Sequence, residues 1–287
     1  MGRKLCCVGR GGGEWIGDGN THIWVSLTEG RTSPILGIGV AGSAVTIDWG
    51  DGTTPDVLTG AFGSKWTPAH EYAKAGNYVI TLKGKFVLNG SGDTYGGASI
   101  LRYSTGSDKR NAAYQNAVQK VELNNVSAIG ANAFADCNSL TSINIPDSVT
   151  SINSNAFKSC YLLSNIHIPN GVTSIGTGAF SYCYGLASVN IPDGVTSIGT
   201  NAFYNCNRLI NVRMPNGVTS IGTGAFSNCT MLTFVDFTKH TAVPTLSGTS
   251  AFTSIPDDCE IRVPAALADE WKAATNWATY ADKIVGV

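Results

Sequence analysis

Apolar residues recur every 23 residues through the second half of the chain. Phenylalanine, cysteine, isoleucine and leucine each form a column with this step. The columns are Phe134, Phe157, Phe180, Phe203 and Phe226; Cys137, Cys160, Cys183, Cys206 and Cys229; Ile129, Ile152, Ile175, Ile198 and Ile221; and Leu140, Leu163, Leu186, Leu209 and Leu232. A repeat of this length predicts a solenoid in which each repeat is one coil and equivalent residues stack in adjacent coils.

Within one repeat, the polar and apolar positions predict a strand, a second extended segment and a turn. Residues 186–191 read L-x-x-V-x-I, which places alternate side chains inside the coil. Pro192 then ends the strand, because proline has no N–H for ladder pairing. Residues 195–199 form the second extended segment, and residues 199–206 return the chain in a tight turn or a single helical turn. One coil cannot bury its core alone, so neighbouring coils must stack.

The apolar pattern of the C-terminal segment predicts a helical cap. Solenoids expose apolar rungs at their ends and need such covers. Pro264 suits the first position of a helix, and the helix is expected to cover the last coil around Phe252 and Ile261. The apolar residues assigned to the cap are Leu267 and Trp271, which are four apart on one helix face, with Trp277 and Tyr280 just beyond them.

The first third of the chain shows alternating strands separated by turn residues. Residues 44–53 and 70–82 alternate apolar and polar side chains, with Gly-Asp-Gly and Ala-Gly-Asn as turns. Asp48 and Asp51 could be a carboxylate pair for acid–base work or calcium, but the turn-forming reading is favoured because aspartates bond their own backbone in such turns. Residues 89–117 lack a period, which predicts a long connection partly ordered on the first coil.

Whole phrases of the repeat resemble one family. The phrase Gly-Val-Thr-Ser-Ile-Gly-x-x-Ala-Phe-x-x-Cys-x-x-Leu at 172–186 recurs at 195–209 and 218–232 and closely resembles the BspA-type leucine-rich repeat. The resemblance covers about residues 121–263. It implies a right-handed solenoid used for adhesion and recognition, and it implies no catalytic chemistry.

A second resemblance lies upstream. The motifs D-x-G-D-G-T over 48–53 and H-x-Y-x-x-x-G-x-Y over 70–78 resemble the polycystic-kidney-disease-type (PKD) immunoglobulin-like domain. This implies a β-sandwich that serves as a spacer or a binding domain. The expected fold is therefore mainly β, with an N-terminal β-sandwich, a leucine-rich-repeat solenoid and a C-terminal capping helix. The expected units are an N-terminal arm over 1–20, the sandwich over 21–88, a connecting segment over 89–120, the solenoid over 121–263 and the cap over 264–287.

The net charge and the composition disfavour several classes of binding partner. The net charge is -1 and only 14% of residues are charged, which disfavours nucleic-acid and acidic-membrane binding. No apolar run reaches the roughly 18 residues that a spanning helix needs, so no membrane insertion is expected. Any partner is therefore expected to be bound through neutral polar and aromatic side chains. Residues 1–13 begin with basic residues but hold no apolar segment before the glycines, so export by the general secretory route is not expected.

No pattern of a cofactor or catalytic site stands out. The five repeat cysteines could form disulfides or bind zinc, but zinc sites use paired spacings, so a reduced, buried thiol column is favoured. Residues 37–42 fit G-x-G-x-x-G, yet a strand follows where a dinucleotide site needs a helix. The four histidines share no ligand spacing. We therefore expect no metal, no cofactor and no enzymatic activity.

Two surfaces of the solenoid are candidates for ligand binding. Outward strand positions in adjacent coils, about 4.8 Å apart, form a regular polar face suited to a repetitive ligand such as a glycan. One column is Asn144, His167, Asn190, Arg213 and Asp236, and the other is Ser142, Asn165, Ser188, Asn211 and Phe234. The alternative interpretation is that this face contacts only water and binds no ligand. The competing surface is on the turn side, at Tyr161 and Tyr184 with Tyr182 and Tyr204 nearby, where aromatic rings can stack on sugars or protein.

Three functions compete. Adhesion-type domains without an export signal favour a phage virion or tail-associated component that assembles in the host cytoplasm and binds a host surface protein or glycan. Its N-terminal region would then contact other virion proteins. The first alternative is a secreted or cell-surface adhesin, which requires a leader. The second is an accessory module of a carbohydrate-active enzyme, which would need an acidic pair at a pocket.

Overall fold

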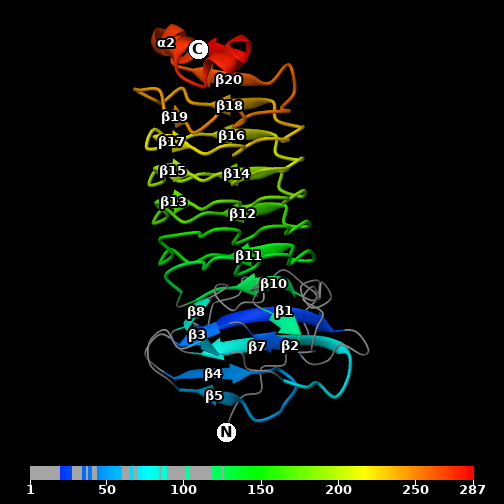
Figure 1. Cartoon of the computed structure of the whole chain (residues 1–287). Helices are drawn as coiled ribbons and strands as arrows, with labels where there is room; N and C mark the ends of the chain where they lie inside the picture. Colours follow the sequence, from blue (N-terminus) through cyan, green and yellow to red (C-terminus); the bar gives the residue numbers. More distant parts are fainter. Residues whose placement is uncertain are drawn as a thin grey trace.

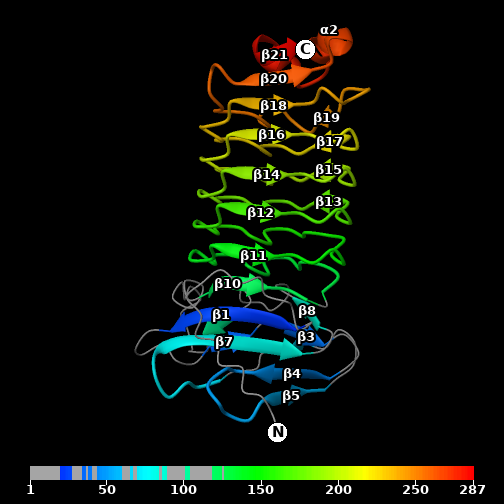
Figure 2. The same cartoon turned by 180° about the vertical axis from the view of Figure 1, so that it is seen from behind.

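The stacked coils form one column between an N-terminal group of strands and a C-terminal helix (Figures 1 and 2). The structure is a computed structural model. It describes residues 20–27, 34–36, 38–40, 44–59, 65–66, 70–83, 86–88, 101–103, 118–124 and 126–287. Side chains are described in these ranges except in 34–40, 65–66, 86–88 and 101–103.

The solenoid carries a parallel sheet along one side, in the order β12-β14-β16-β18-β20-β21. Each coil gives it one short strand whose central residue is buried and whose neighbours face outward, as in β12 and β14. The strands are β12 (Asn165–His167), β14 (Ser188–Asn190), β16 (Asn211–Arg213), β18 (Phe234–Asp236), β20 (Glu260–Val263) and β21 (Ile284–Gly286). From β12 to β18 the pairing joins residues 23 apart, such as Val189 and Val212. The expected L-x-x-V-x-I strand is therefore confirmed.

A second, narrower parallel sheet contains the other extended segment of each coil. Its order is β13-β15-β17-β19. The strands are β13 (Ser174–Ile175), β15 (Ser197–Ile198), β17 (Ser220–Ile221) and β19 (Thr245–Leu246). Bridges between Ile129 and Ile152 and between Ile152 and Ile175 extend the isoleucine column to earlier coils. The return segments are hydrogen-bonded turns, and they also join adjacent coils, as where the Phe157 N–H donates to the Ala179 carbonyl at 2.7 Å.

The core of the solenoid consists of the predicted columns. The phenylalanine rings of adjacent coils are stacked nearly parallel, with centroids 5.1 to 5.5 Å apart from Phe134 to Phe252. The rings at 134, 157, 180, 203 and 226 have no exposed surface. Beside them, the thiols of Cys160, Cys183, Cys206 and Cys229 each donate to the phenylalanine carbonyl of the preceding coil, as from Cys183 Sγ to Phe157 O at 3.1 Å. The cysteines at 137, 160, 183, 206, 229 and 259 are buried and form no disulfide with one another, as the predicted thiol column requires.

These thiols are expected to be unreactive in the folded protein. Burial raises the pKa of Cys183 and Cys229 to about 12, and it raises that of Cys160 and Cys206 well above the ordinary thiol value. The reactive thiolate is therefore scarce at neutral pH, and reagents have no access to it. Counting repeat thiols with a thiol reagent, with and without denaturant, should show reaction only after unfolding. Rapid labelling of Cys183 in the native protein would contradict this arrangement.

The C-terminal segment closes the last coil as predicted. It contains a 3-10 turn η1 (Ala265–Leu267), the helix α2 (Ala268–Ala273) and a second 3-10 segment η2 (Ala278–Lys283). Trp271, Trp277 and Tyr280 are buried. Trp277 and Tyr280 pack on Phe252 with ring centroids 5.7 and 5.6 Å apart. The segment then returns as β21, which pairs with β20 and adds one strand to the sheet, a role that the helical pattern did not predict.

At the other end, β10 and β11 of the first coils belong to a further sheet that they share with the N-terminal strands. The order β11-β10-β1-β7-β4-β5 joins the first coil to the upstream region. The strands are β1 (Thr21–Leu27), β4 (Val45–Asp48), β5 (Asp56–Leu58), β7 (Gly76–Lys83), β10 (Val118–Glu122) and β11 (Ser142–Asn144). Strand β10 pairs parallel with β11 and antiparallel with β1. Thr21 and Asn124 fix this junction through hydrogen bonds of 2.8 and 2.9 Å. Because β1 occupies the free edge of β10, it protects the first coil from pairing with another chain.

The upstream motifs form the strands and the turn that were expected. Strands β4 and β7 lie in the two predicted segments, and Asp51 accepts hydrogen bonds from the backbone and hydroxyl of Thr53. The structure adds an unpredicted contact of 2.7 Å between His70 Nε2 and Asp51 Oδ2. Burial alone would raise the pKa of Asp51, but the bonds from Thr53 and His70 outweigh it and lower the pKa to about 2. The turn-forming reading of Asp51 is therefore confirmed.

Five further short strands complete the N-terminal part. They are β2 (Pro34–Leu36), β3 (Ile38–Val40), β6 (Lys65–Trp66), β8 (Phe86–Leu88) and β9 (Leu101–Tyr103). β2 pairs with β9, and β6, β3 and β8 form a separate sheet. Their side chains lie outside the described residues, so the sandwich and the PKD-like assignment stay predictions. The arm expected over 1–20, apart from Asn20, and most of the connecting segment expected over 89–120 also lie outside the described residues.

Candidate functional site

The strand face presents the two predicted outward columns in register from β12 to β18, whereas their first members, Ser142 and Asn144, lie on β11 in the sheet shared with the N-terminal strands. In one column, Asn165 pairs with Ser188, and Ser188 pairs with Asn211 on the next strand. In the other column, His167 pairs with Asn190, and Asn190 pairs with Arg213. The members of these columns are exposed or half-exposed, whereas the residues between them are buried. The polar face is therefore present as a continuous ladder from β12 to β18.

At its C-terminal end, this ladder is occupied by contacts within the chain. Arg213 Nε lies 4.0 Å from Asp236 Oδ2, and Asp236 accepts hydrogen bonds from the Thr238 N–H and hydroxyl at 2.9 and 2.7 Å. Burial alone would raise the pKa of Asp236, but the Thr238 bonds outweigh it and lower the pKa. Arg262 lies over the Phe234 ring at 4.1 Å and pairs with Glu260. Asp236 and Phe234 therefore already have partners.

On the turn side, the four candidate tyrosines form one continuous cluster. Tyr161 and Tyr184 are stacked with centroids 5.0 Å apart, and their side chains remain 39% and 38% exposed. Tyr182 meets Tyr184 edge-on at 6.1 Å and Tyr204 edge-on at 5.3 Å. Partial burial, and then the neighbouring tyrosines, raise the pKa of Tyr184. Its hydroxyl is therefore neutral at physiological pH and can both donate and accept a hydrogen bond.

The backbone at Tyr182 is unusual for so large a residue. Its φ is 62°, in the left-handed region. The equivalent position in other coils has the same φ of 60 to 61° but holds a small polar residue: Asp136, Ser159, Asn205 and Asn228. A bulky side chain here costs about 1 to 3 kcal/mol, and such strain concentrates at functional sites. Tyr182 therefore stands out from its column.

Gly185, the residue after Tyr184, lies in close contact with the backbone of Tyr161. The Gly185 N–H donates to the Tyr161 carbonyl at 3.0 Å, and a Cβ at Gly185 would lie 2.7 Å from that oxygen. No larger residue fits this approach without moving the backbone. The stack of the two tyrosines therefore depends on a residue that carries no side chain.

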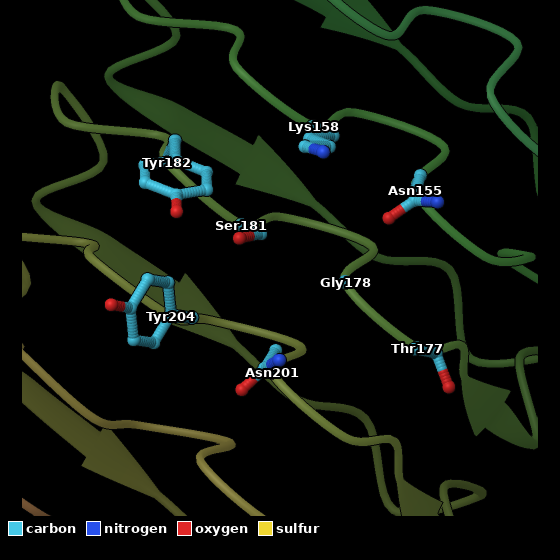
Figure 3. A pocket seen from close by; sticks show the side chains of 8 residues that line it. All are labelled: Asn155, Lys158, Thr177, Gly178, Ser181, Tyr182, Asn201 and Tyr204. Carbon is cyan, nitrogen blue, oxygen red and sulfur yellow. The ribbon is translucent and has the colours of Figure 1, made fainter. Parts of the chain in front are cut away.

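A hollow of about 440 Å³ adjoins the cluster (Figure 3). It spans three coils, and the middle coil carries small residues. Gly178 lies between Asn155 and Asn201, and Ser181 lies between Lys158 and Tyr204. The lining residues are Asn155, Lys158, Thr177, Gly178, Ser181, Tyr182, Asn201 and Tyr204. Of this set, only Tyr182 and Tyr204 are predicted from the sequence as binding residues. The signal for the other residues is the alternation of large and small side chains along two columns of the repeat.

Groups suited to metal or acid–base chemistry are scarce on these surfaces. In the ranges that the structure describes, no cluster of three or more His, Cys, Asp or Glu side chains could hold a metal ion. The lining of the hollow includes no carboxylate, imidazole or thiol. The Asp51–His70 pair lies in the N-terminal part, where Trp49 stacks on His70 at 5.0 Å and Tyr72 meets it edge-on. That pair therefore holds the turn in place.

The described helices are too short or too polar to cross a membrane.

Coils of 23 residues, a parallel sheet of short strands and stacked core rings define a leucine-rich-repeat β-solenoid. The family described as BspA type Leucine rich repeat region matches residues 109–255, in 6 copies. The chain belongs to this family. The match includes all of β10, which begins at Val118, three residues before the position at 121 where the first coil was expected to begin.

Several solved structures are similar to parts of the chain. A leucine-rich-repeat protein of T. pallidum is 31% identical over 40% of this chain and 62% of its own, with a TM-score of 0.38. A leucine-rich cell surface protein of Faecalibacterium prausnitzii is 34% identical over 43% and 39%, with a TM-score of 0.34. A leucine-rich-repeat protein of Bacteroides ovatus is 22% identical over 77% of this chain and 60% of its own, with a TM-score of 0.45. The chain spans less than two thirds of each. A search of curated proteins found no match.

Proposed function

We propose that the chain is a non-enzymatic recognition protein that binds a surface ligand through the turn side of its solenoid. The observation that carries this proposal is the tyrosine cluster: four aromatic side chains from three adjacent coils meet at the surface, where Tyr161 and Tyr184 are exposed and the other two are half-buried. Tyrosines supply large contact area with few rotatable bonds, and they are enriched where proteins bind partners. The polar strand face is the second candidate, and the internal contacts of Asp236 and Phe234 weaken its case.

The cellular setting that we propose is extracellular or on a cell surface. Membership of the BspA-type family supports this reading, which was an alternative at the level of sequence. The virion component, which rested on the first residues of the chain, receives no such support. The lack of carboxylate, imidazole and thiol groups in the hollow supports a binding role over a catalytic one.

Replacing the four tyrosines should weaken attachment to cells while leaving the fold intact. The variant Tyr161→Asn, Tyr182→Asn, Tyr184→Asn and Tyr204→Ser uses residues that other coils hold at the same positions, such as Asn138, Asn205, Asn207 and Ser227. The expected loss of affinity is about tenfold or more, because aromatic anchors commonly contribute more than 1 kcal/mol each. Flow cytometry of the labelled protein on a panel of bacterial and animal cells measures it.

The control is a strand-face variant, Asn190→Ser, Arg213→Ser and Asp236→Ser, which should bind like the unmodified protein. Circular dichroism and thermal unfolding establish that both variants fold. If the strand-face variant loses attachment and the tyrosine variant keeps it, the strand face is the binding surface. If the unmodified protein attaches to none of the cells, the recognition role itself is wrong.

A further inference from the structure

We infer that the hollow beside Tyr182 and Tyr204 binds a sugar residue of a neutral glycan, with Tyr161 and Tyr184 extending the site along the chain of sugars. This inference rests on the proposed turn-side function and names the class of its ligand. Three features of the described residues carry it: the shape of the hollow, the polar groups that line it and the orientation of the tyrosine rings.

The shape of the hollow follows from two positions at which the middle coil has a smaller residue than the coils on either side. The column that contains Gly178 holds asparagine in both adjacent coils, and all three residues have positive φ. The positive φ does not by itself require glycine at position 178, because Asn155 and Asn201 adopt the same backbone conformation. The lack of a side chain at Gly178 makes room for the Asn155 amide oxygen, with which a Cβ there would collide. Gly178 and the small Ser181 form the middle of the hollow, between the longer side chains of the two adjacent coils, as Figure 3 shows.

The lining offers hydrogen-bonding groups that match sugar hydroxyls. A sugar hydroxyl both donates and accepts, and so do an asparagine amide and the hydroxyls of serine, threonine and tyrosine. Asn155 and Asn201 present such amides from the two outer coils, and Thr177 and Ser181 of the middle coil add hydroxyls to the lining. No aliphatic side chain lines the hollow, and Lys158 is its single charged residue. This composition suits a hydroxyl-rich, uncharged ligand.

The rings add apolar surface in two orientations. Tyr161 and Tyr184 are inclined by only 26° to one another, whereas Tyr182 is turned by 84° from Tyr184 and by 79° from Tyr204. Tyr182 therefore has no ring stacked parallel on it within the cluster. The apolar face of a sugar ring can pack on such an aromatic face while its hydroxyls reach the polar groups beside it. The left-handed backbone of Tyr182 fixes this position at the rim.

A protein partner would use different chemistry at this place. Strong anchors in protein interfaces fill desolvated, largely apolar pockets, which the polar hollow is not. The exposed apolar residue next to the cluster is Leu162, whose side chain is 56% exposed. It adjoins Tyr161 in sequence and does not line the hollow. Leu162 therefore serves as an internal control, because a protein partner would use it and a sugar in the hollow would not.

The test uses the full chain and the cells to which it attaches. Mild periodate oxidation of the cells, which cleaves the vicinal diols of sugars, should abolish binding, and protease treatment serves as the parallel arm. Soluble mannan, dextran and cello-oligosaccharides, which are neutral and contain vicinal diols, are used as competitors, and at least one should displace the protein. Because Lys158 is the only charge in the lining, binding should change little between low and high salt.

Two variants separate a sugar in the hollow from a sugar elsewhere. Gly178→Asn fills the hollow with the residue of the adjacent coils; its Cβ would collide only with the end of the Asn155 side chain, which can turn aside. It should weaken binding about tenfold or more, equivalent to at least 1.4 kcal/mol. Tyr204→Ser removes one side of the hollow and should also weaken binding about tenfold or more. It replaces Gly178→Asn as the test if that variant fails to fold. Leu162→Ser should bind normally.

Binding that survives periodate and is lost after protease treatment overturns the glycan inference, and it leaves the turn-side function standing if the tyrosine variant is still weakened. Periodate-sensitive binding that tolerates both Gly178→Asn and Tyr204→Ser also overturns the inference, because the sugar is then held elsewhere. Normal binding by the variant that lacks all four tyrosines removes the proposed function and this inference together.

Discussion

Replacing Phe180 or Phe203 by alanine is expected to lower the free energy of unfolding by about 3 to 5 kcal/mol, the usual cost of truncating a buried phenylalanine. Neither ring has exposed surface. Phe180 is stacked on Phe157 at 5.3 Å and on Phe203 at 5.2 Å, so its removal leaves a cavity that two coils share. Because each coil is stable only through its neighbours, the loss affects the stacking on both sides.

Chemical denaturation of the full chain, followed by circular dichroism, measures this loss. Phe234→Ala is the matched control, because Phe234 is half-exposed on the strand face and contacts Arg262 rather than the core. Its cost should stay below about 1 kcal/mol, within the range of surface substitutions. A cost for Phe180→Ala as small as that of Phe234→Ala would mean that the phenylalanine column is not the core of the solenoid.

Trp277→Ala is expected to destabilise the C-terminal end by about 3 to 5 kcal/mol, since it truncates a large buried side chain. Trp277 is 1% exposed, packs against Trp271 at 4.7 Å and Phe237 at 5.5 Å, and donates from Nε1 to the Pro244 carbonyl at 2.7 Å. Its loss opens the cover over Phe252, so the last coil should expose apolar surface. The buried Pro244 carbonyl also loses its donor, which adds to the cost.

Thermal unfolding measures the stability, and hydrogen exchange of the last coil locates the effect. Amides of β18 and β20 should exchange faster in Trp277→Ala, and those of β12 should change least, because each coil contacts only its neighbours. Lys272→Ala, an exposed change in the same cap, is the control and should leave both measurements unchanged. Uniformly faster exchange along the whole solenoid would contradict a cap that acts locally.

The repeat explains why so much of the solenoid could be predicted. Each coil is a local unit, and a period of 23 residues places Phe157, Phe180 and Phe203 at equivalent points of stacked coils, whatever the rest of the chain does. The buried thiols, the strand with its inner valine or isoleucine, and the helical cap with Trp271 follow from the same local patterns. Tyr161 and Tyr184 could be placed one coil apart for this reason.

The ends of the solenoid and the binding surface depend on contacts that the period does not contain. The pairing of β1 with β10 joins residues about a hundred positions apart, such as Thr21 and Asn124, and β21 adds a strand from a segment whose pattern is helical. The hollow arises only when side chains of three coils are compared in space, because Gly178 and Ser181 create it by being smaller than their neighbours. The meeting of Tyr182 with both Tyr184 and Tyr204 likewise depends on ring rotations.

The sequence by itself determined the coil, its core columns and the membership of a repeat family, because these follow from short-range spacing repeated many times. Only the tertiary structure decided how the first and last coils are closed and which surface gathers aromatic and polar groups into one place. The physical reason is that edge pairing, cavities and ring contacts are properties of side chains and strands brought together by folding, and sequence spacing does not fix their distances.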